Sequence, residues 1–408
     1  MPTHRRLALS ALVIGLASSP AAADAAPPSF SIAARETADL WDELAGSVNT
    51  GAVMLNKFQI SASVSRPFGL PGLSAHAQVF RTDGHSLSAH VGDIQTVSNI
   101  EALTTTRLFE TWVEQRFGDD RASFAVRAGL MDLNADFDAL DTPTLFINSS
   151  HGIGPDISRS GVNGPSIFPV SSLGLRLSWL PSQKWTFRVA AFDGVAGDPD
   201  RPKAIVAVRL ARRDGALLIA EADYHLSDAA TVAAGAWGYT ADQVLASGFA
   251  PHRDRGFYAS IEGPIPGQTI WRAWARAGVA DGDAQIVRSY LGLGLVGQGV
   301  WRSRPEDRVG IAVAHAGIGR PARAAFGLGR AETNFEASYQ YRLRNTLAVQ
   351  PDVQYILHPE GAPHAANALV LGLRLILTAG YPHQSPATDS ADPTVAPEGP
   401  QPPAAPAA

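Results

Sequence analysis

The chain has 408 residues, of which 45% are hydrophobic, 17% are charged and none is cysteine, and its formal net charge is −5. The lack of cysteine excludes a disulfide framework, a thiolate metal site and a thiol nucleophile. The acidic balance argues against a nucleic-acid partner, and the apolar content argues against disorder over most of the chain. After the first 23 residues, no apolar run approaches the ~18 residues of a membrane-spanning helix.

The N-terminus has the three parts of a secretory signal peptide. Arg5 and Arg6 form a basic region, residues 7–17 are apolar, and residues 21–23 supply small side chains for cleavage. We therefore expect residues 1–23 to be a signal peptide that is removed on export. An uncleaved N-terminal anchor is the alternative.

The remaining sequence alternates apolar and polar residues, which is the period of a β-strand with one apolar face. In residues 334–342, for example, Phe335, Ala337 and Tyr339 alternate with polar residues. Residues 203–211 also alternate, but we assign them to a loop, because an extra strand there would break the alternation of short and long connections between strands. The sixteen predicted strands lie near residues 29–38, 50–64, 72–82, 107–117, 121–130, 172–180, 184–193, 216–226, 229–240, 255–264, 269–281, 288–300, 306–316, 332–343, 346–357 and 366–378.

The predicted connections alternate in length. Those after even-numbered strands are short, as at residues 118–120, whereas most of the others are long, as at 83–106, 131–171 and 194–215. An even number of strands with short turns at one rim and long loops at the other is typical of a transmembrane β-barrel. Lipid offers no partners for backbone groups, so strands can cross it only as a closed barrel. We therefore predict an all-β fold, a 16-stranded antiparallel transmembrane β-barrel of the outer membrane, over residues 24–378.

Two features favour this barrel over a soluble all-β protein, whose strands also alternate. Charged residues recur on the polar face of nearly every strand, which a water-filled lumen permits and a packed core does not. Aromatic residues also stand at strand ends, where the girdles of a membrane barrel belong; they are Phe109, Phe117, Trp179, Trp185 and Tyr341.

Residues 379–408 are rich in Pro and Ala and are expected to form a disordered periplasmic tail.

Several segments, taken in order and spacing, resemble the carbohydrate-selective porins of the OprB type. The resemblance extends over nearly all of the predicted barrel, and it implies a 16-stranded outer-membrane barrel and passive uptake of sugars. The chain departs from the family in two ways: no Trp-Gly-Gly-type segment precedes the first strand, and a tail follows the last strand. The similar segments are Ser98–Ala102, Gly129–Asp138, Leu145–Gly152, Gly164–Pro169, Asp214–Tyr224, Gln350–Tyr355 and Ala368–Leu375.

The longest predicted connection, 131–171, is expected to be functional, because loops of this length in a compact domain usually are. The resemblance to porins implies that it folds inward and constricts the lumen. Its candidates for contact with a sugar are Asp132, Asn134, Asp136, Asn148 and His151.

The strands add polar side chains whose parity points them into the lumen. Carboxylates and guanidinium groups can bind pairs of sugar hydroxyls, and opposed charges across a narrow lumen favour polar neutral solutes. The alternative is that these are ordinary lumen residues tied in salt bridges. The candidates are Glu110, Arg127, Arg176, Arg188, Glu221, Asp223, Glu336, Gln340 and Arg342.

We therefore expect passive diffusion of mono- or oligosaccharides through a water-filled barrel, surrounded by outer-membrane lipid, in a monomer or a homotrimer. A general porin for ions or organic acids and a secreted soluble β-rich carbohydrate-binding protein are the alternatives. Asp132, Asp136 and Asp138 could form a carboxylate pair for glycoside hydrolysis, but a solvated loop explains them better. The histidines match no metal-ligand spacing, so we predict no enzyme, no catalytic residue, no metal and no cofactor.

Overall fold

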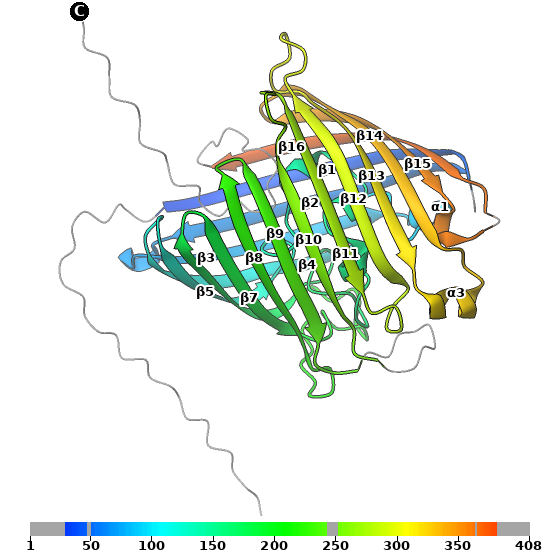
Figure 1. Ribbon diagram of the computed structural model, residues 1–408. Coiled ribbons are helices and arrows are strands. Elements are labelled where there is room, and N and C mark those ends of the chain that lie inside the picture. Colours follow the sequence, from blue (N-terminus) through cyan, green and yellow to red (C-terminus); the bar gives the residue numbers. More distant parts are fainter. Residues whose placement is uncertain (1–28, 47–49, 243–251, 364, 382–408) are drawn as a thin grey trace, which may run out of the picture.

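Sixteen antiparallel strands close into a barrel in the computed structural model of the chain (Figure 1). Each strand pairs with its neighbours in sequence, and β1 pairs with β16 to complete the cylinder, with Asp39 opposite Arg374. The structure describes residues 29–46, 50–242, 252–363 and 365–381. The predicted fold class is therefore confirmed, strand by strand.

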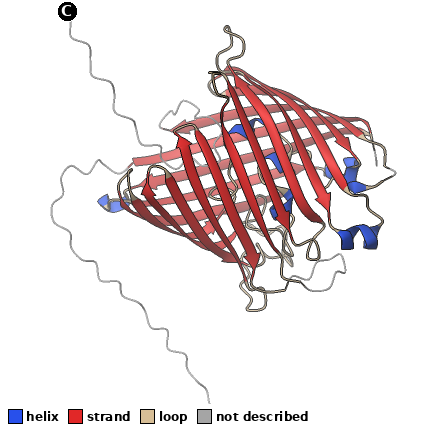
Figure 2. Ribbon diagram, in the orientation of Figure 1, coloured by secondary structure: helices blue, strands red, loops and turns tan. Residues whose placement is uncertain are grey.

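Figure 2 shows that almost all regular structure is strand, with short helical turns in the connections. The strands are β1 (Ser29–Ala45), β2 (Gly51–Ser65), β3 (Leu73–Gly84), β4 (Thr105–Gly118), β5 (Ser123–Met131), β6 (Ser172–Ser182), β7 (Trp185–Asp193), β8 (Ala216–Ser227), β9 (Ala230–Tyr239), β10 (Arg255–Pro264), β11 (Trp271–Ala280), β12 (Val287–Gln298), β13 (Arg308–Ile318), β14 (Ala331–Arg344), β15 (Leu347–Leu357) and β16 (Ala368–Tyr381). The helical turns are η1 (Pro67–Gly69), α1 (Ser88–Val91), η2 (Thr142–Leu145), η3 (Ser149–His151), α2 (Pro155–Ser158), α3 (Arg320–Phe326) and η4 (Pro359–Gly361).

The alternation in the sequence sorts side chains to the two faces of the wall. On β14, Phe335 points outward and is 44% exposed, whereas its neighbour Glu336 points inward and is 2% exposed. The same order holds on β16, where Leu371, Leu373 and Leu375 are exposed and Arg374 is buried. An apolar exterior and a polar interior are the arrangement that a barrel needs in lipid.

The two rims of the barrel differ as predicted. Short connections follow the even-numbered strands and form what we call the short-turn rim, where the ends of β1 and β16 also lie, with Ile32 opposite Tyr381. The long connections 85–104, 132–171 and 194–215 leave the opposite rim, the long-loop rim. Residues 203–211 form no strand, as predicted, although Ile205 accepts a backbone hydrogen bond from Leu108.

Three predicted details are corrected. β1 extends to Ala45 rather than ending near residue 38, and β16 extends to Tyr381, beyond the predicted start of the tail. Phe109 is not a girdle residue: it points inward, is 3% exposed and contacts Phe80. The pairing of β3 with β4 shifts register at Gln78, so that both residue 109 and residue 110 lie on the inner side.

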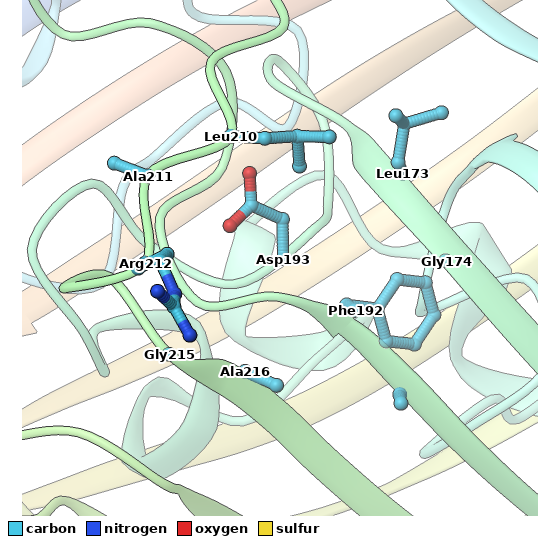
Figure 3. A pocket seen from close by; sticks show the side chains of 10 residues that line it. Leu173, Gly174, Phe192, Asp193, Leu210, Ala211, Arg212, Gly215 and Ala216 are labelled. Atoms are coloured by element: carbon cyan, nitrogen blue, oxygen red, sulfur yellow. The ribbon is translucent and has the colours of Figure 1, made fainter. Parts of the chain in front are cut away.

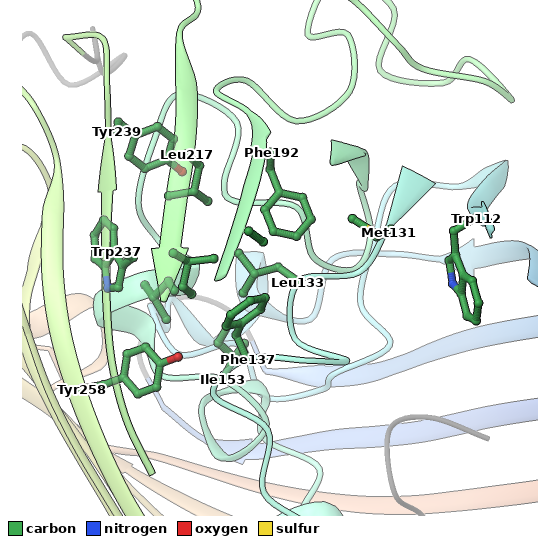
Figure 4. Close-up of a cluster of buried hydrophobic side chains, with 13 residues drawn as sticks. Trp112, Met131, Leu133, Phe137, Ile153, Phe192, Leu217, Trp237, Tyr239 and Tyr258 are labelled. Atoms are coloured by element: carbon green, nitrogen blue, oxygen red, sulfur yellow. The ribbon is translucent and has the colours of Figure 1, made fainter. Parts of the chain in front are cut away.

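The barrel interior is filled in part by the long loop 132–171. Its apolar residues Leu133, Phe137 and Ile157 are fully buried, and they belong to one cluster with inward side chains of β7 to β10 such as Phe192 and Tyr258 (Figure 4). Burial of each such side chain stabilises the folded loop by about 1.5–3 kcal/mol. The predicted inward loop is thus a packed element of the barrel rather than a free strap.

Some predictions fall outside the described residues. These are the signal peptide over residues 1–23 and, beyond Tyr381, the Pro- and Ala-rich tail. Within the described part of the chain, no helix has the length and apolar character to cross a membrane.

Gly372 leaves room for the ring of Trp41 at the seam between β1 and β16. A Cβ atom at Gly372 on β16 would lie 2.3 Å from the ring of Trp41 on β1, which is fully buried. Overpacking of this kind costs about 1–3 kcal/mol, so Gly372→Ala is expected to lower the temperature at which the barrel loses its heat-modifiable migration in detergent gels. Gly152→Ala, where the nearest atom would lie 3.5 Å from the new Cβ, serves as the control. An unchanged transition for Gly372→Ala would contradict the role of this contact.

Candidate functional site: the loop anchored inside the barrel

The irregular backbone of loop 132–171 is held by carboxylates of the inner wall. Glu221 on β8 accepts the amide of Asp138 at 2.8 Å. Glu262 on β10 accepts those of Asp141 and Thr142 at 3.0 and 2.7 Å. Buried backbone amides need acceptors, and these wall carboxylates supply them to a segment that has no sheet partners.

Further wall groups repeat this arrangement. Glu336 on β14 accepts the amides of Ile147 and Asn148. Glu332 lies four residues earlier on the same strand. It accepts the amides of Ile94 and Gln95, in the long loop 85–104, at 2.9 and 3.1 Å. Two inward loops are therefore fastened to one strand by two successive carboxylates of the same parity.

Arg276 on β11 makes the most buried ionic anchor of the loop. Its guanidinium donates to both carboxylate oxygens of Asp138, at 3.0 and 2.8 Å, and also to Asp156. The side chains of all three are 0–3% exposed. Burial raises the pKa of Asp138, and the Arg276 guanidinium opposes that rise. The ionised pair is stable here only because all partners are in place.

A second ionic cluster stands where the loop leaves β5. Arg127 on β5 contacts Glu114 and Asp136 at 2.9 and 3.2 Å. Arg176 on β6 contacts the same two carboxylates at 3.0 and 2.8 Å. The charges of this four-residue cluster, two guanidinium groups and two carboxylates, sum to zero. The guanidinium carbon of Arg127 lies 3.9 Å from the centre of the Trp112 ring.

A third ionic group continues the row of charges along the wall. Arg188 on β7 lies 3.1 Å from Glu221 and also contacts Asp223. Glu221 in turn accepts a hydrogen bond from Tyr258 at 2.7 Å. The inner faces of β5, β6 and β7 therefore carry three successive guanidinium groups, which pair with carboxylates of β4, β8 and the loop.

The structure distinguishes the predicted site residues by their exposure to solvent. Those that keep solvent-accessible area belong to the first part of the loop and to the wall beside it: Glu110, Asp132, Asn134, Asp136 and Arg188. Arg127, Arg176 and Asp223 lie in the same region but are nearly buried in their ion pairs. Arg342 lies away from the loop at the short-turn rim, 3.8 Å from Glu306.

Five further predicted residues are at most 6% exposed and lie within the loop or on the inner wall; they are Asn148, His151, Glu221, Glu336 and Gln340. Glu221 and Glu336 accept amides of the loop, Asn148 donates to Gln354, and Gln340 donates to Gln350. Contact of these residues with a solute stays a prediction.

Sequence reasoning also missed several anchors. Glu262 and Arg374 have inward parity and could have been found by extending the same rule to every strand. Asp156 could not, because it lies in the short helical turn α2 within the loop, outside any strand. Arg374 is paired with Asp39 at 2.7 Å, and Ser98 of the loop 85–104 donates to Asp39 at 2.7 Å, so the first long loop is also anchored inside.

Two other features lie outside this region. Figure 3 shows a shallow pocket beside β6 and β7 at the long-loop rim, with Leu173, Leu210 and Asp193 among its lining residues. Within the described residues, His252, Asp281 and Asp283 bring three ligand atoms within 4.8 Å of one another. Arg255 lies 4.0 Å from Asp281, and we assign this group no metal.

Comparison with known proteins decides the family. Residues 54–378 match the OprB family of carbohydrate-selective porins. This chain belongs to the OprB family. The resemblance inferred from sequence motifs is therefore confirmed, as are the outer-membrane porin fold and the class of carbohydrate porins.

Solved structures agree on the fold. The high-pH structure of OprB from Pseudomonas putida is 21% identical, with a TM-score of 0.74 over 86% of this chain and 94% of that one. The low-pH structure of the same protein is 17% identical, with a TM-score of 0.53 over 86% and 92%. The outer-membrane channel DcaP of Acinetobacter baumannii is 9% identical, with a TM-score of 0.56 over 86% and 97%. No curated protein sequence matches this chain significantly.

His151 makes the anchoring of the loop sensitive to acid. Its ring is fully buried, with ring centres 5.1 Å from Phe146 and 5.5 Å from Trp274. Burial lowers its pKa to about 3, and the nearby Asp352 carboxylate opposes the shift only in part. A released loop would bind a proton at the ordinary histidine pKa of about 6.5. Anchoring is therefore favoured above pH 6.5 and is weakened progressively as the pH falls from there toward 3.

We expect more frequent current fluctuations of single channels at pH 5 than at pH 7. His151→Phe, which keeps the ring but cannot bind a proton, should reduce this difference. His315→Phe on the outer face of β13 is the control and should behave as the native chain. Identical acid responses of His151→Phe and the native chain would exclude His151 as the cause.

Proposed function

We propose that this chain lets sugars diffuse passively across the outer membrane, along the space between the anchored loop and the inner faces of β4 to β7, which we call the first wall. The supporting observation is the uneven exposure of inward polar groups. The side chains of Glu114, Asp136 and Arg188 are 16%, 11% and 23% exposed, whereas those of Asp138 and Glu336 are at most 1% exposed. Solvent reaches the first wall and is excluded from the part of the inner wall that the loop covers.

The chemistry of this lining suits a neutral polar solute. Carboxylates and guanidinium groups accept and donate hydrogen bonds, so they can replace the water molecules that a sugar loses in a narrow passage. Because these charges are paired with one another, an ion gains little net attraction from them. Asn134 braces the loop backbone beside this passage by donating to the carbonyls of Phe137, Asp138 and Gly152.

Sugar flux and sugar-dependent block of single-channel current test this proposal. Purified protein in proteoliposomes should admit monosaccharides faster than organic acids of similar size. In planar bilayers, added sugar should interrupt the ionic current in a concentration-dependent manner. Discrete channels with equal rates for sugars and organic acids would instead establish a general porin, and the absence of channels would overturn the proposal.

Export by an N-terminal signal peptide is part of the same proposal. We infer that residues 1–23 are removed, because their basic, apolar and small-residue regions follow the order that signal peptidases require. The N-terminal sequence of the protein from outer membranes should begin near residue 24. A retained Met1 would indicate an anchor instead.

A further inference from the structure

Three exposed arginine side chains gather at one sector of the long-loop rim. Arg288 is the second residue of β12, Arg320 is the first residue of α3, and Arg330 directly precedes β14. All three are exposed, and among the residues that the structure describes none of their guanidinium groups forms a salt bridge. This sector therefore presents positive charge that the protein itself does not neutralise.

Arginines elsewhere on the same rim are mostly paired. In the loop 194–215, three of the four arginines contact carboxylates: Arg201, Arg209 and Arg213 do so at 2.8, 2.9 and 3.7 Å. At the start of β10, Arg255 lies 4.0 Å from Asp281. The three unpaired guanidinium groups beside β12 to β14 are thus a local feature, on a chain whose net charge is −5.

The strand register brings two of these arginines to the ends of one row of small residues. Ser289 on β12 lies opposite Gly317 on β13, and Gly317 lies opposite Ala331 on β14. All three have the outward parity of their strands. Arg288 and Arg330 are the chain neighbours of the outer two members of this row.

The third arginine is tied to the same place by the backbone. Ile318 donates to the carbonyl of Arg330 at 2.8 Å, and Gly319 donates to the carbonyl of Ile286 at 2.9 Å. Arg320 follows directly, at the point where α3 begins beyond the end of β13 (Figure 1). Its segment therefore lies between the two that carry Arg288 and Arg330.

Few carboxylates stand close enough to offset this charge. Arg323, three residues along α3, adds a fourth guanidinium, and its Nε is buried without a hydrogen-bond partner. Asp283 and Glu360 are the exposed acidic residues of the neighbouring connections. Glu332 is buried and accepts loop amides on the inner side of the wall. Four guanidinium groups against two exposed carboxylates leave the sector positive.

An apolar surface continues from this sector down the outer wall. Leu293 lies opposite Val313, and Val313 lies opposite Phe335. Leu293 and Phe335 are 45% and 44% exposed. This apolar row is four residues, about 13 Å, along the strands from the row of small residues. Positive charge at the rim and apolar side chains below it match the two ends of an anionic lipid.

We propose that this sector is a binding site for the phosphate groups of a lipid in the outer leaflet. We call Arg288, Arg320 and Arg330 the basic rim. The long loops of such barrels face the cell exterior, so the basic rim lies at the level of outer-leaflet headgroups. A guanidinium group matches the geometry of a phosphate with two parallel hydrogen bonds. A free phosphate ion would gain nothing from the apolar row, so the two features together favour a lipid.

Binding of a purified phosphorylated glycolipid tests this inference. Native mass spectrometry in mild detergent should show that the protein retains added lipid A with two phosphate groups. Loss of a hydrogen bond to a charged group costs about 1.5–3 kcal/mol, so Arg288→Gln, Arg320→Gln and Arg330→Gln combined should weaken retention by about tenfold or more. The control combines Arg201→Gln, Arg209→Gln and Arg213→Gln, which removes the same charge from another part of the same rim and should leave retention unchanged.

Two further probes define the chemistry of the ligand. Lipid A from which both phosphates have been removed should be retained much less, and inorganic phosphate at equal concentration should not displace the intact lipid. Equal retention by the two triple variants would overturn the inference, and so would equal retention of the dephosphorylated lipid or ready displacement by inorganic phosphate. Sugar flux per barrel should be the same in both triple variants and the native chain, so failure here leaves the proposed function untouched.

Discussion

Replacing Arg276 with methionine is expected to raise single-channel conductance severalfold and to make it fluctuate. Methionine retains much of the volume of the side chain but leaves the buried carboxylates of Asp138 and Asp156 without their counter-charge. Removing one partner of a buried pair costs about 3–5 kcal/mol, which is comparable to the contribution of one or two of the apolar contacts that hold the loop. The loop should therefore leave the wall for a measurable fraction of the time.

Conductance in planar bilayers and the size cutoff for sugars in proteoliposome swelling measure this effect. Arg276→Met should admit oligosaccharides that the native channel excludes. Arg121→Met, in the exposed turn between β4 and β5, is the control and should leave both values unchanged.

The origin of the effect can be tested by removing the stranded charges. Arg276→Met combined with Asp138→Asn and Asp156→Asn should recover part of the native conductance, because no buried charge then lacks a partner. Native conductance and native cutoff in the single variant Arg276→Met would show that the loop is held without this anchor.

The strands could be predicted closely because each outward residue faces lipid and each inward residue faces polar surroundings, which imposes period two on every strand. The rule fails where that contrast is lost. The predicted first strand ends near residue 38, short of Ala45, because Asp42 lies on the outer face and interrupts the apolar pattern. Phe109 departs from the rule because a register shift puts two successive residues on one face.

The site was predicted less well, for a different physical reason. Parity shows that Glu221 and Glu336 point inward, but it does not show whether they meet water or protein. Both are covered because an irregular loop needs acceptors for its own amides. The need for hydrogen-bond acceptors arises from the backbone amides of residues 132–171, and it cannot be seen in the pattern of side chains along the sequence. Asp156 lies outside the strands, so the alternation of residues along a strand does not predict which way its side chain points.

Replacing Asp136 with asparagine is expected to shift the channel from neutral solutes toward anions. Asp136 and Glu114 together balance Arg127 and Arg176. With Asp136 neutral, two guanidinium groups face one carboxylate, and the cluster acquires a net positive charge beside the passage. In a narrow lumen with low-dielectric walls such a charge acts over several ångströms and raises the local concentration of anions.

Reversal potentials under a KCl gradient measure this change. The permeability ratio of chloride to potassium should rise several-fold in Asp136→Asn and should fall again as the salt concentration increases, since mobile ions screen the exposed charge. Asp120→Asn, at an exposed turn of the short-turn rim, removes the same charge far from the cluster and should leave the ratio unchanged.

The same variant separates the two channel functions that the barrel permits. If solutes pass along the first wall, Asp136→Asn should slow monosaccharide entry, because a carboxylate acceptor for hydroxyl groups has been lost, while entry of organic acids increases. If the passage lies elsewhere, both rates and the ion selectivity should equal those of the native channel. Asp136 is therefore the position at which a single substitution tests both the route and the preference for neutral sugars.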